Sequence, residues 1–121
     1  MDNYSPVLLC VDDDPAGLNL RKIVLERAGY TVLTATSGEE AMSLMAVHAP
    51  DLLITDHLLP SMSGVQLAGE AKRLRPEVRV LILSGLIECP ESANVDAFLC
   101  KVDGPGALIE KIGTVLKGRD S

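Results

Sequence analysis

Short apolar runs alternate with amphipathic segments from one end of this chain to the other. Five runs are dominated by aliphatic residues and have the length of single strands: 7–11, 30–35, 52–55, 78–83 and 97–100. Strands with such continuous apolar character are typical of a parallel sheet that helices cover on both faces. The alternation therefore predicts an α/β fold, because parallel strands need crossover connections, which are usually helices.

Helices are predicted between and after these runs, at 15–28, 37–49, 65–74 and 105–117. The second begins with a capping box, in which Ser37 accepts from the first amides and Glu40 reaches back. Asp14 directly precedes Pro15, so it fits the N-cap position of the first helix. Five βα units without a large insertion fit the flavodoxin-like doubly wound (βα)5 fold, whose five-stranded parallel sheet has the order 2-1-3-4-5.

Composition limits the classes of function. The chain has 121 residues, enough for one domain, and its net charge of −6 argues against nucleic-acid binding. No apolar run is long enough to cross a bilayer, and the first residues lack the basic and apolar regions of a secretory signal. We therefore expect no membrane contact and a cytoplasmic location. Cys10 and Cys100 lie in apolar runs without a CxxC spacing, which favours small core residues over a metal or redox site.

Polar residues end four of the five predicted strands. The first strand runs into the acidic segment 12–14, the third ends at Asp56, the fourth at Ser84 and the fifth at Lys101. In the predicted order these ends converge on one rim, where folds of this type bind their ligands. Clustered carboxylates attract a hard cation such as Mg²⁺, and one of them can attack phosphorus to form an acyl phosphate. The lysine and the hydroxyl would then neutralise the phosphoryl oxygens.

Four segments resemble the motifs of one family, in order along essentially the whole chain. They are Leu-Leu-Cys-Val-Asp-Asp-Asp-Pro (8–15), Pro-Asp-Leu-Leu-Ile-Thr-Asp-His-Leu-Leu-Pro-Ser-Met-Ser-Gly (50–64), the strand 80–85, and Phe-Leu-Cys-Lys (98–101). They are similar to the response-regulator receiver domains (CheY-like) of two-component phosphorelay systems. The resemblance implies a single receiver domain over residues 1–121, which acts as a phosphoacceptor in signal transduction.

The resemblance also implies roles for single residues. Asp56 would be the phosphorylated nucleophile, and Mg²⁺ would be the one cofactor. The metal ligands would be Asp12, Asp13 and Asp56 together with the backbone carbonyl of Leu58. Lys101 would pair with a phosphoryl oxygen. His57, next to the nucleophile, is expected to face solvent, because neighbours along a strand point in opposite directions.

The switch and the partners follow from the same resemblance. Ser84 would bond a phosphoryl oxygen, and the rotamer of Phe98 would report the state of the switch. The phosphoryl donor would be a sensor histidine kinase or a histidine phosphotransfer protein, and the output would go to a downstream protein or an attached output domain. Such a domain is a signalling protein that catalyses only its own phosphoryl transfer and a slow autodephosphorylation. Leu58 and Leu86 flank the path of the attacking water in this family and are apolar here, which predicts a long-lived phospho-form.

Three positions depart from the family pattern. Lys101 is followed by Val102 in place of a proline that is usually cis, so we expect a trans peptide there and a reshaped loop. Met-Ser-Gly (62–64) replaces the more usual Met-Asp-Gly. Lys101 lies only 17 positions after Ser84, which predicts a fourth helix that is shortened or absent. Any homodimer is then expected to form through a non-standard face.

Two other functions are compatible with part of the pattern. A degenerate receiver that docks a partner without phosphorylation would not need the acidic residues, the serine and the lysine at the strand ends. A haloacid-dehalogenase-like phosphohydrolase would use Asp12 and Asp14 as its Asp-x-Asp pair, but Asp56 would then have no role. The identity of the phosphorylated residue separates these alternatives.

Overall fold

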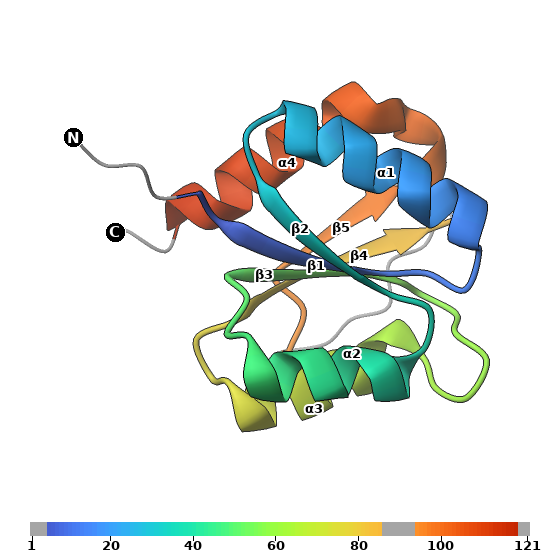
Figure 1. Ribbon diagram of the computed structural model, residues 1–121, viewed down its shortest axis with the longest axis vertical. Helices are drawn as coiled ribbons and strands as arrows, with labels where there is room; N and C mark the ends of the chain where they lie inside the picture. Colours follow the sequence, from blue (N-terminus) through green and yellow to red (C-terminus); the bar gives the residue numbers. More distant parts are fainter. Residues whose placement is uncertain (1–4, 86–93, 119–121) are drawn as a thin grey trace.

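The computed structural model describes residues 5–85 and 94–118. Five parallel strands form one sheet in the order β2-β1-β3-β4-β5 (Figure 1). The strands are β1 (Val7–Val11), β2 (Thr31–Ala35), β3 (Leu52–Asp56), β4 (Arg79–Ser84) and β5 (Ala97–Cys100). This arrangement confirms the predicted doubly wound α/β fold and its strand order.

Helices cover both faces of the sheet (Figure 1). One face carries α1 (Pro15–Arg27) and α4 (Gly104–Gly118), and the other carries α2 (Gly38–Val47) and α3 (Gly64–Leu74). These are the four α-helices of the described residues, and β5 is followed by a short 3-10 turn, η1 (Lys101–Asp103). The count agrees with a fourth crossover helix that is shortened or absent, although residues 86–93, where it would lie, are outside the described residues.

Alternate side chains of the strands build two apolar cores. In β1, Leu9 and Val11 pack in the core under α2 and α3, whereas Leu8 and Cys10 pack in the core under α1 and α4. The same alternation runs through β3 and β4, as expected where successive side chains point to opposite faces. Because both faces are buried, the strands need apolar residues at almost every position, which is the pattern that the sequence shows.

Two helix starts are stabilised by side chains. The Ser37 hydroxyl accepts from the Glu40 amide at 3.1 Å, as predicted, but the Glu40 carboxylate accepts from the Thr36 amide rather than from the Ser37 amide. A complete capping box stands at α3, where Ser63 and Gln66 each accept from the other's backbone amide. Sequence reasoning had not identified this second box.

The N-cap prediction for α1 is right in position only. Asp14 is the N-cap residue and Pro15 begins the helix, but the Asp14 side chain makes no capping hydrogen bond. Its backbone amide instead donates to Asp12 Oδ1 at 3.0 Å. The backbone of this turn therefore helps to hold a strand-end carboxylate.

Asp96 holds the chain where it returns to the sheet before β5. Its Oδ2 accepts from the Val80 amide and from the Lys72 ammonium, both at 2.8 Å, and its own amide donates to the Val80 carbonyl. Arg79 lies 3.5 Å from its other carboxylate oxygen. One aspartate thus ties β5 to β4 and α3 directly after the short β4–β5 connection.

The two described cysteines differ in their environment, and this difference predicts their reactivity. Burial raises the pKa of the Cys10 thiol to about 12, against a smaller lowering effect of the nearby Arg21 charge. Since the thiolate is the nucleophile and forms only as the pH approaches this pKa, Cys10 should stay unmodified at mildly alkaline pH.

We expect iodoacetamide to alkylate the half-buried Cys100 of the native protein well before Cys10. Peptide mass mapping of a time course is the measurement, and the same reaction in denaturant is the control, in which both thiols should react alike. Equal rates for the two cysteines in the native protein would contradict the prediction.

Candidate functional site

Three aspartates meet at the carboxyl ends of β1 and β3, which are neighbours in the sheet. Val11 and Thr55 are partners in the register, so Asp12 and Asp56 follow them side by side. One carboxylate oxygen from each of Asp12, Asp13 and Asp56 lies within 4.8 Å of the others. The sheet reverses its strand order at β1, with β2 on one side and β3 on the other, and ligands of such folds bind at this position.

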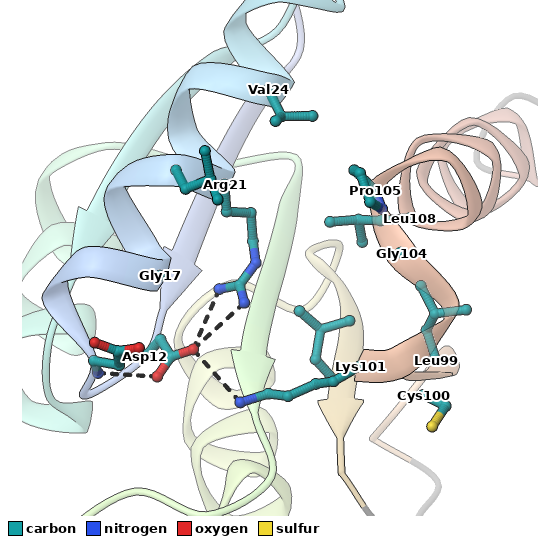
Figure 2. A pocket seen from close by; sticks show the side chains of 13 residues that line it. Asp12, Gly17, Arg21, Val24, Leu99, Cys100, Lys101, Gly104, Pro105 and Leu108 are labelled. Carbon is teal, nitrogen blue, oxygen red and sulfur yellow. Dashed lines mark hydrogen bonds and ion pairs between the residues drawn. The ribbon is translucent and has the colours of Figure 1, made fainter.

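Asp12 is the buried member of the group, with a side chain only 5% exposed. Both terminal nitrogens of Arg21 lie 3.4 Å from its Oδ2, and the Lys101 ammonium lies 3.6 Å from the same atom (Figure 2). The Asp14 amide donates to Oδ1. Two cations and an amide thus offset the cost of burying this carboxylate.

Arg21 is the site residue that sequence reasoning missed. A signal was present, because Arg21 lies three residues after Leu18 and four before Leu25, on the buried stripe of α1. A charged residue on a buried stripe needs a partner. What the sequence could not tell is which of the nearby carboxylates this partner would be.

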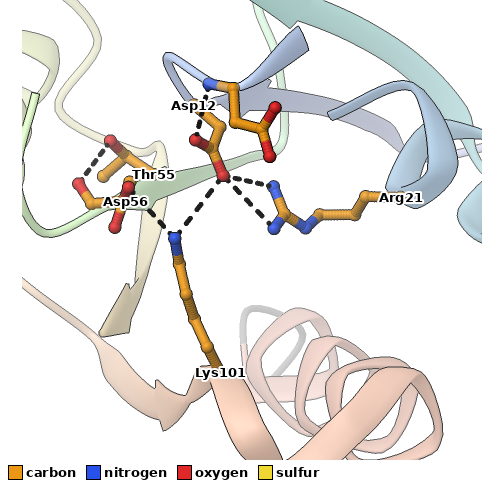
Figure 3. A network of polar contacts seen from close by, with 6 residues as sticks. Asp12, Arg21, Thr55, Asp56 and Lys101 are labelled. Atoms are coloured by element: carbon orange, nitrogen blue, oxygen red, sulfur yellow. Dashed lines mark hydrogen bonds and ion pairs between the residues drawn. The ribbon is translucent and has the colours of Figure 1, made fainter. Parts of the chain in front are cut away.

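Lys101 bridges the ends of the two strands. Its ammonium lies 3.1 Å from Asp56 Oδ2, in addition to its contact with Asp12 (Figure 3). The Asp56 side chain is 15% exposed, whereas that of Lys101 is 34% exposed, so the pair is open to solvent on the lysine side. Because Lys101 is the first residue of η1, directly after β5, the strand end itself aims the side chain across β4 toward β3.

The loop after Asp56 folds back tightly on the strand end. The Thr55 hydroxyl donates to the Asp56 carbonyl at 3.0 Å, and the Gly64 amide donates to the His57 carbonyl at 2.7 Å. A Cβ at Gly64 would lie 2.6 Å from the Asp56 carbonyl oxygen, which is closer than atoms approach. This contact is the physical reason for a glycine eight positions after Asp56.

The expectation for His57 was wrong. The residue is only partly exposed, and its ring Nδ1 is buried without a hydrogen-bond partner among the described residues. Its backbone amide donates to the Leu83 carbonyl of β4. The His57 side chain is therefore partly covered, with Nδ1 buried, rather than fully facing solvent.

The remaining predicted residues lie around this cluster, and their roles stay predictions. Ser84 ends β4, is buried, and follows Leu83, the register partner of Asp56. Phe98 is half-buried in β5 and packs against the core under α2 and α3. Leu58 has a side chain that is largely exposed, and its backbone pairs with Ser63.

The peptide between Lys101 and Val102 is trans, as predicted, since the described residues contain no cis peptide bond. The η1 turn replaces the expected loop and leads directly into α4. Gly104 makes the transition with a φ of 86°, a left-handed conformation that favours glycine.

This arrangement suits charge-dense chemistry. Carboxylate oxygens are the ligands that Mg²⁺ prefers, and three of them converge here, so the donor set fits that ion. A carboxylate such as Asp56 can also act as a nucleophile, and the adjacent Lys101 ammonium can stabilise negative charge that arrives on it.

Comparisons with known proteins agree with this geometry. The family model described as the response regulator receiver domain matches residues 8–112. The transcriptional regulatory protein GlrR of Escherichia coli is 35% identical over an alignment of 115 residues, and the match covers 91% of this chain but only 26% of GlrR. The chain likewise spans 48% of the length of the PhoP regulator of Bacillus subtilis.

Solved structures show the same fold. A CheY-like receiver domain protein of Methanospirillum hungatei is 30% identical, with a TM-score of 0.87 over 97% of this chain and 98% of its own. The response regulator TrrA of Thermotoga maritima, solved in complex with Mg²⁺ and BeF, is 28% identical, with a TM-score of 0.83 over 91% of this chain and 98% of its own. None of the described helices combines the length and the apolar character needed to span a membrane.

Removal of the Lys101 charge should destabilise the domain modestly. We expect Lys101→Met to lower the free energy of unfolding by roughly 1 kcal/mol, because the ammonium offsets Asp12 and Asp56 at a partly exposed position. The loss should shrink at high ionic strength, since salt screens the carboxylate repulsion that remains.

Urea unfolding at low and high salt is the measurement. Lys111→Met is the matched control, because Lys111 forms no ion pair among the described residues of α4 and its neighbours. A Lys101→Met protein as stable as the parent at low salt would show that the lysine does not offset the acidic cluster.

Proposed function

This chain belongs to the response regulator receiver domains, and from that premise we propose that residues 1–121 form a single receiver domain phosphorylated on Asp56. The observation that carries the proposal is the position of the Lys101 ammonium, 3.1 Å from the Asp56 carboxylate and beside Asp12. A carboxylate that only ended a strand would not need two acidic neighbours and a shared cation. The phosphoryl donor is a sensor histidine kinase or a histidine phosphotransfer protein.

The transfer exchanges one bond for another. An oxygen of Asp56 donates an electron pair to phosphorus as the phosphorus–nitrogen bond of the donor phosphohistidine breaks, and the released imidazole nitrogen takes up a proton. The product is an acyl phosphate on Asp56. Lys101 then forms a charge-assisted bond to a phosphoryl oxygen.

The residues that would hold Mg²⁺ are Asp12, Asp13, Asp56 and, through its backbone carbonyl, Leu58. When bound, the ion would supply positive charge to the phosphoryl oxygens during transfer. The carboxylate cluster supports this assignment, and so does the complex of TrrA with Mg²⁺ and BeF. No other cofactor is proposed.

Phosphorylation would be read out through Ser84 and Phe98. The Ser84 hydroxyl, at the end of the strand next to Asp56, bonds a phosphoryl oxygen, and Phe98 on the neighbouring strand changes its packing in response. The output goes to a downstream protein or to an attached output domain. The domain binds no nucleic acid and no membrane itself, acts in the cytoplasm, and forms any homodimer through a non-standard face.

The decisive experiment is incubation with acetyl phosphate and Mg²⁺, followed by intact mass. We expect the parent to gain one phosphoryl group and Asp56→Asn to gain none, whereas the control Asp103→Asn, an exposed aspartate of η1, behaves like the parent. Chelation of the metal should abolish the reaction.

Two outcomes would contradict the proposal. A phosphoryl group that persists on Asp56→Asn and maps to Asp12 would favour a phosphohydrolase of the haloacid-dehalogenase type. A parent that gains no phosphoryl group from any donor would favour a docking module that works without phosphorylation.

The lifetime of the phospho-form depends on the apolar residues around the path of water. Leu58 is 65% exposed beside Asp56 and cannot orient a water molecule, and Leu86, which lies outside the described residues, is apolar as well. We expect the parent to stay phosphorylated for minutes or longer.

The variant that carries both Leu58→Asn and Leu86→Glu should lose its phosphoryl group about tenfold faster, since positioning the water is worth roughly 1.4 kcal/mol of the barrier. Phosphate release measures the decay, and Leu74→Asn, an exposed leucine at the end of α3, is the control. Decay of the parent within seconds, or an unchanged rate in the double variant, would refute the role of these leucines.

A further inference from the structure

Arg21 forms an ion pair with Asp12, whose carboxylate the proposed function assigns to the metal. Its guanidinium lies 3.4 Å from Asp12 Oδ2 through both terminal nitrogens, and its side chain is only 16% exposed. Lys101 shares the same oxygen, and the Asp14 amide holds the other one. Each oxygen of Asp12 therefore already has a donor before any metal arrives.

The net charge of the cluster determines how the Arg21–Asp12 contact affects metal binding. The carboxylates of Asp12, Asp13 and Asp56, together with Arg21 and Lys101, carry three negative and two positive charges, which leaves one unit of negative charge. A divalent ion that binds Asp12 must displace the guanidinium or accept it as a close neighbour. Displacement breaks an ion pair at a buried carboxylate, and retention places like charges side by side.

We propose that Arg21 competes with the divalent cation for Asp12 and so sets the metal affinity of the site. The proposal rests on the proposed function, because it concerns the metal of the same site. Arg21 acts through Asp12 and is therefore a positioning residue. In the metal-free protein it holds the acidic cluster in place, and it makes Mg²⁺ binding weaker than the three carboxylates alone would give.

The structure also provides a place for the displaced guanidinium. A groove of about 400 Å³ opens between α1 and the start of α4, and Arg21 lies in its wall (Figure 2). Gly17, one turn before Arg21 on α1, contributes no side chain to this wall, while Val24 and Pro105 line it farther along. The groove therefore offers space beside the Arg21 side chain for a displaced guanidinium.

A purely structural role for Arg21 has a different signature. If the arginine only tied α1 to the end of β1, its removal would lower the stability of the domain and leave the metal affinity unchanged. Competition predicts a higher metal affinity, because removal of the guanidinium takes away one of the two cations that contact Asp12 Oδ2. The two roles are thus separated by a metal titration and not by stability alone.

The experiment is an NMR titration with Mg²⁺ at physiological salt, following the backbone amide shifts of residues 12, 13 and 56. We expect Arg21→Gln to bind Mg²⁺ about tenfold more tightly than the parent. Even when solvent screens it, the repulsion between Mg²⁺ and a nearby guanidinium is large enough to change the affinity by about this factor. Arg21→Lys, which keeps the charge, should stay near the parent, and Arg21→Met, which removes the charge but keeps an apolar stem, serves as the test if Arg21→Gln folds poorly.

Lys22→Gln is the matched control. It removes the same charge from the next residue of α1, which makes no contact with Asp12 among the described side chains, so its affinity should stay close to that of the parent. Equal affinities of Arg21→Gln and the parent would overturn the inference and leave the proposed function intact. If neither protein responds to millimolar Mg²⁺, both the inference and the metal assignment fail, and the acetyl phosphate experiment shows whether Asp56 still accepts a phosphoryl group.

Discussion

Repulsion between carboxylates at the ends of two adjacent strands is the constraint around which this domain is organised. Asp12 and Asp56 emerge side by side from β1 and β3, and the first of them is almost fully buried. Such a pair is unfavourable unless cations come with it. Lys101 and Arg21 supply them, one from the end of β5 and the other from α1. Elements that are distant in the sequence are thus tied together at one rim.

The parallel sheet makes this convergence unavoidable. Every strand in the order β2-β1-β3-β4-β5 points its carboxyl end to the same rim, so residues that directly follow the strands become neighbours. Backbone contacts then fix the rim in detail. The Asp14 amide holds one oxygen of Asp12, and the glycine at position 64 lets the loop after Asp56 close onto the strand end. The apolar sheet and its backbone contacts therefore hold several charged side chains close together at one rim.

The two faces of the sheet contribute differently to the proposed switch. Phe98 belongs to the core under α2 and α3, whereas the groove beside Arg21 opens on the face of α1 and α4. Asp96 anchors the start of β5 to β4 and α3, so the shortened connection still delivers Lys101 at a defined position. Metal-linked movement of Arg21 and phosphoryl-linked movement of Phe98 would consequently occur on opposite faces of one sheet.

Much of this fold could be predicted from the sequence, because apolar runs and helix stripes are local signals that burial on both faces makes strong. The strands and the polar residues at their ends follow from such signals, the strand order from the doubly wound fold that five βα units fit, and the trans peptide from Val102 in place of a proline. The partner of Arg21, the packing of His57 and the groove between α1 and α4 do not follow from them. The groove joins helices far apart in the chain, and the Arg21–Asp12 pair, although only nine residues apart, depends on the rotamers that packing allows. The sequence by itself therefore determined which chemical groups reach the rim, and only the tertiary structure decided which of them touch, since an ion pair forms across space that no local pattern records.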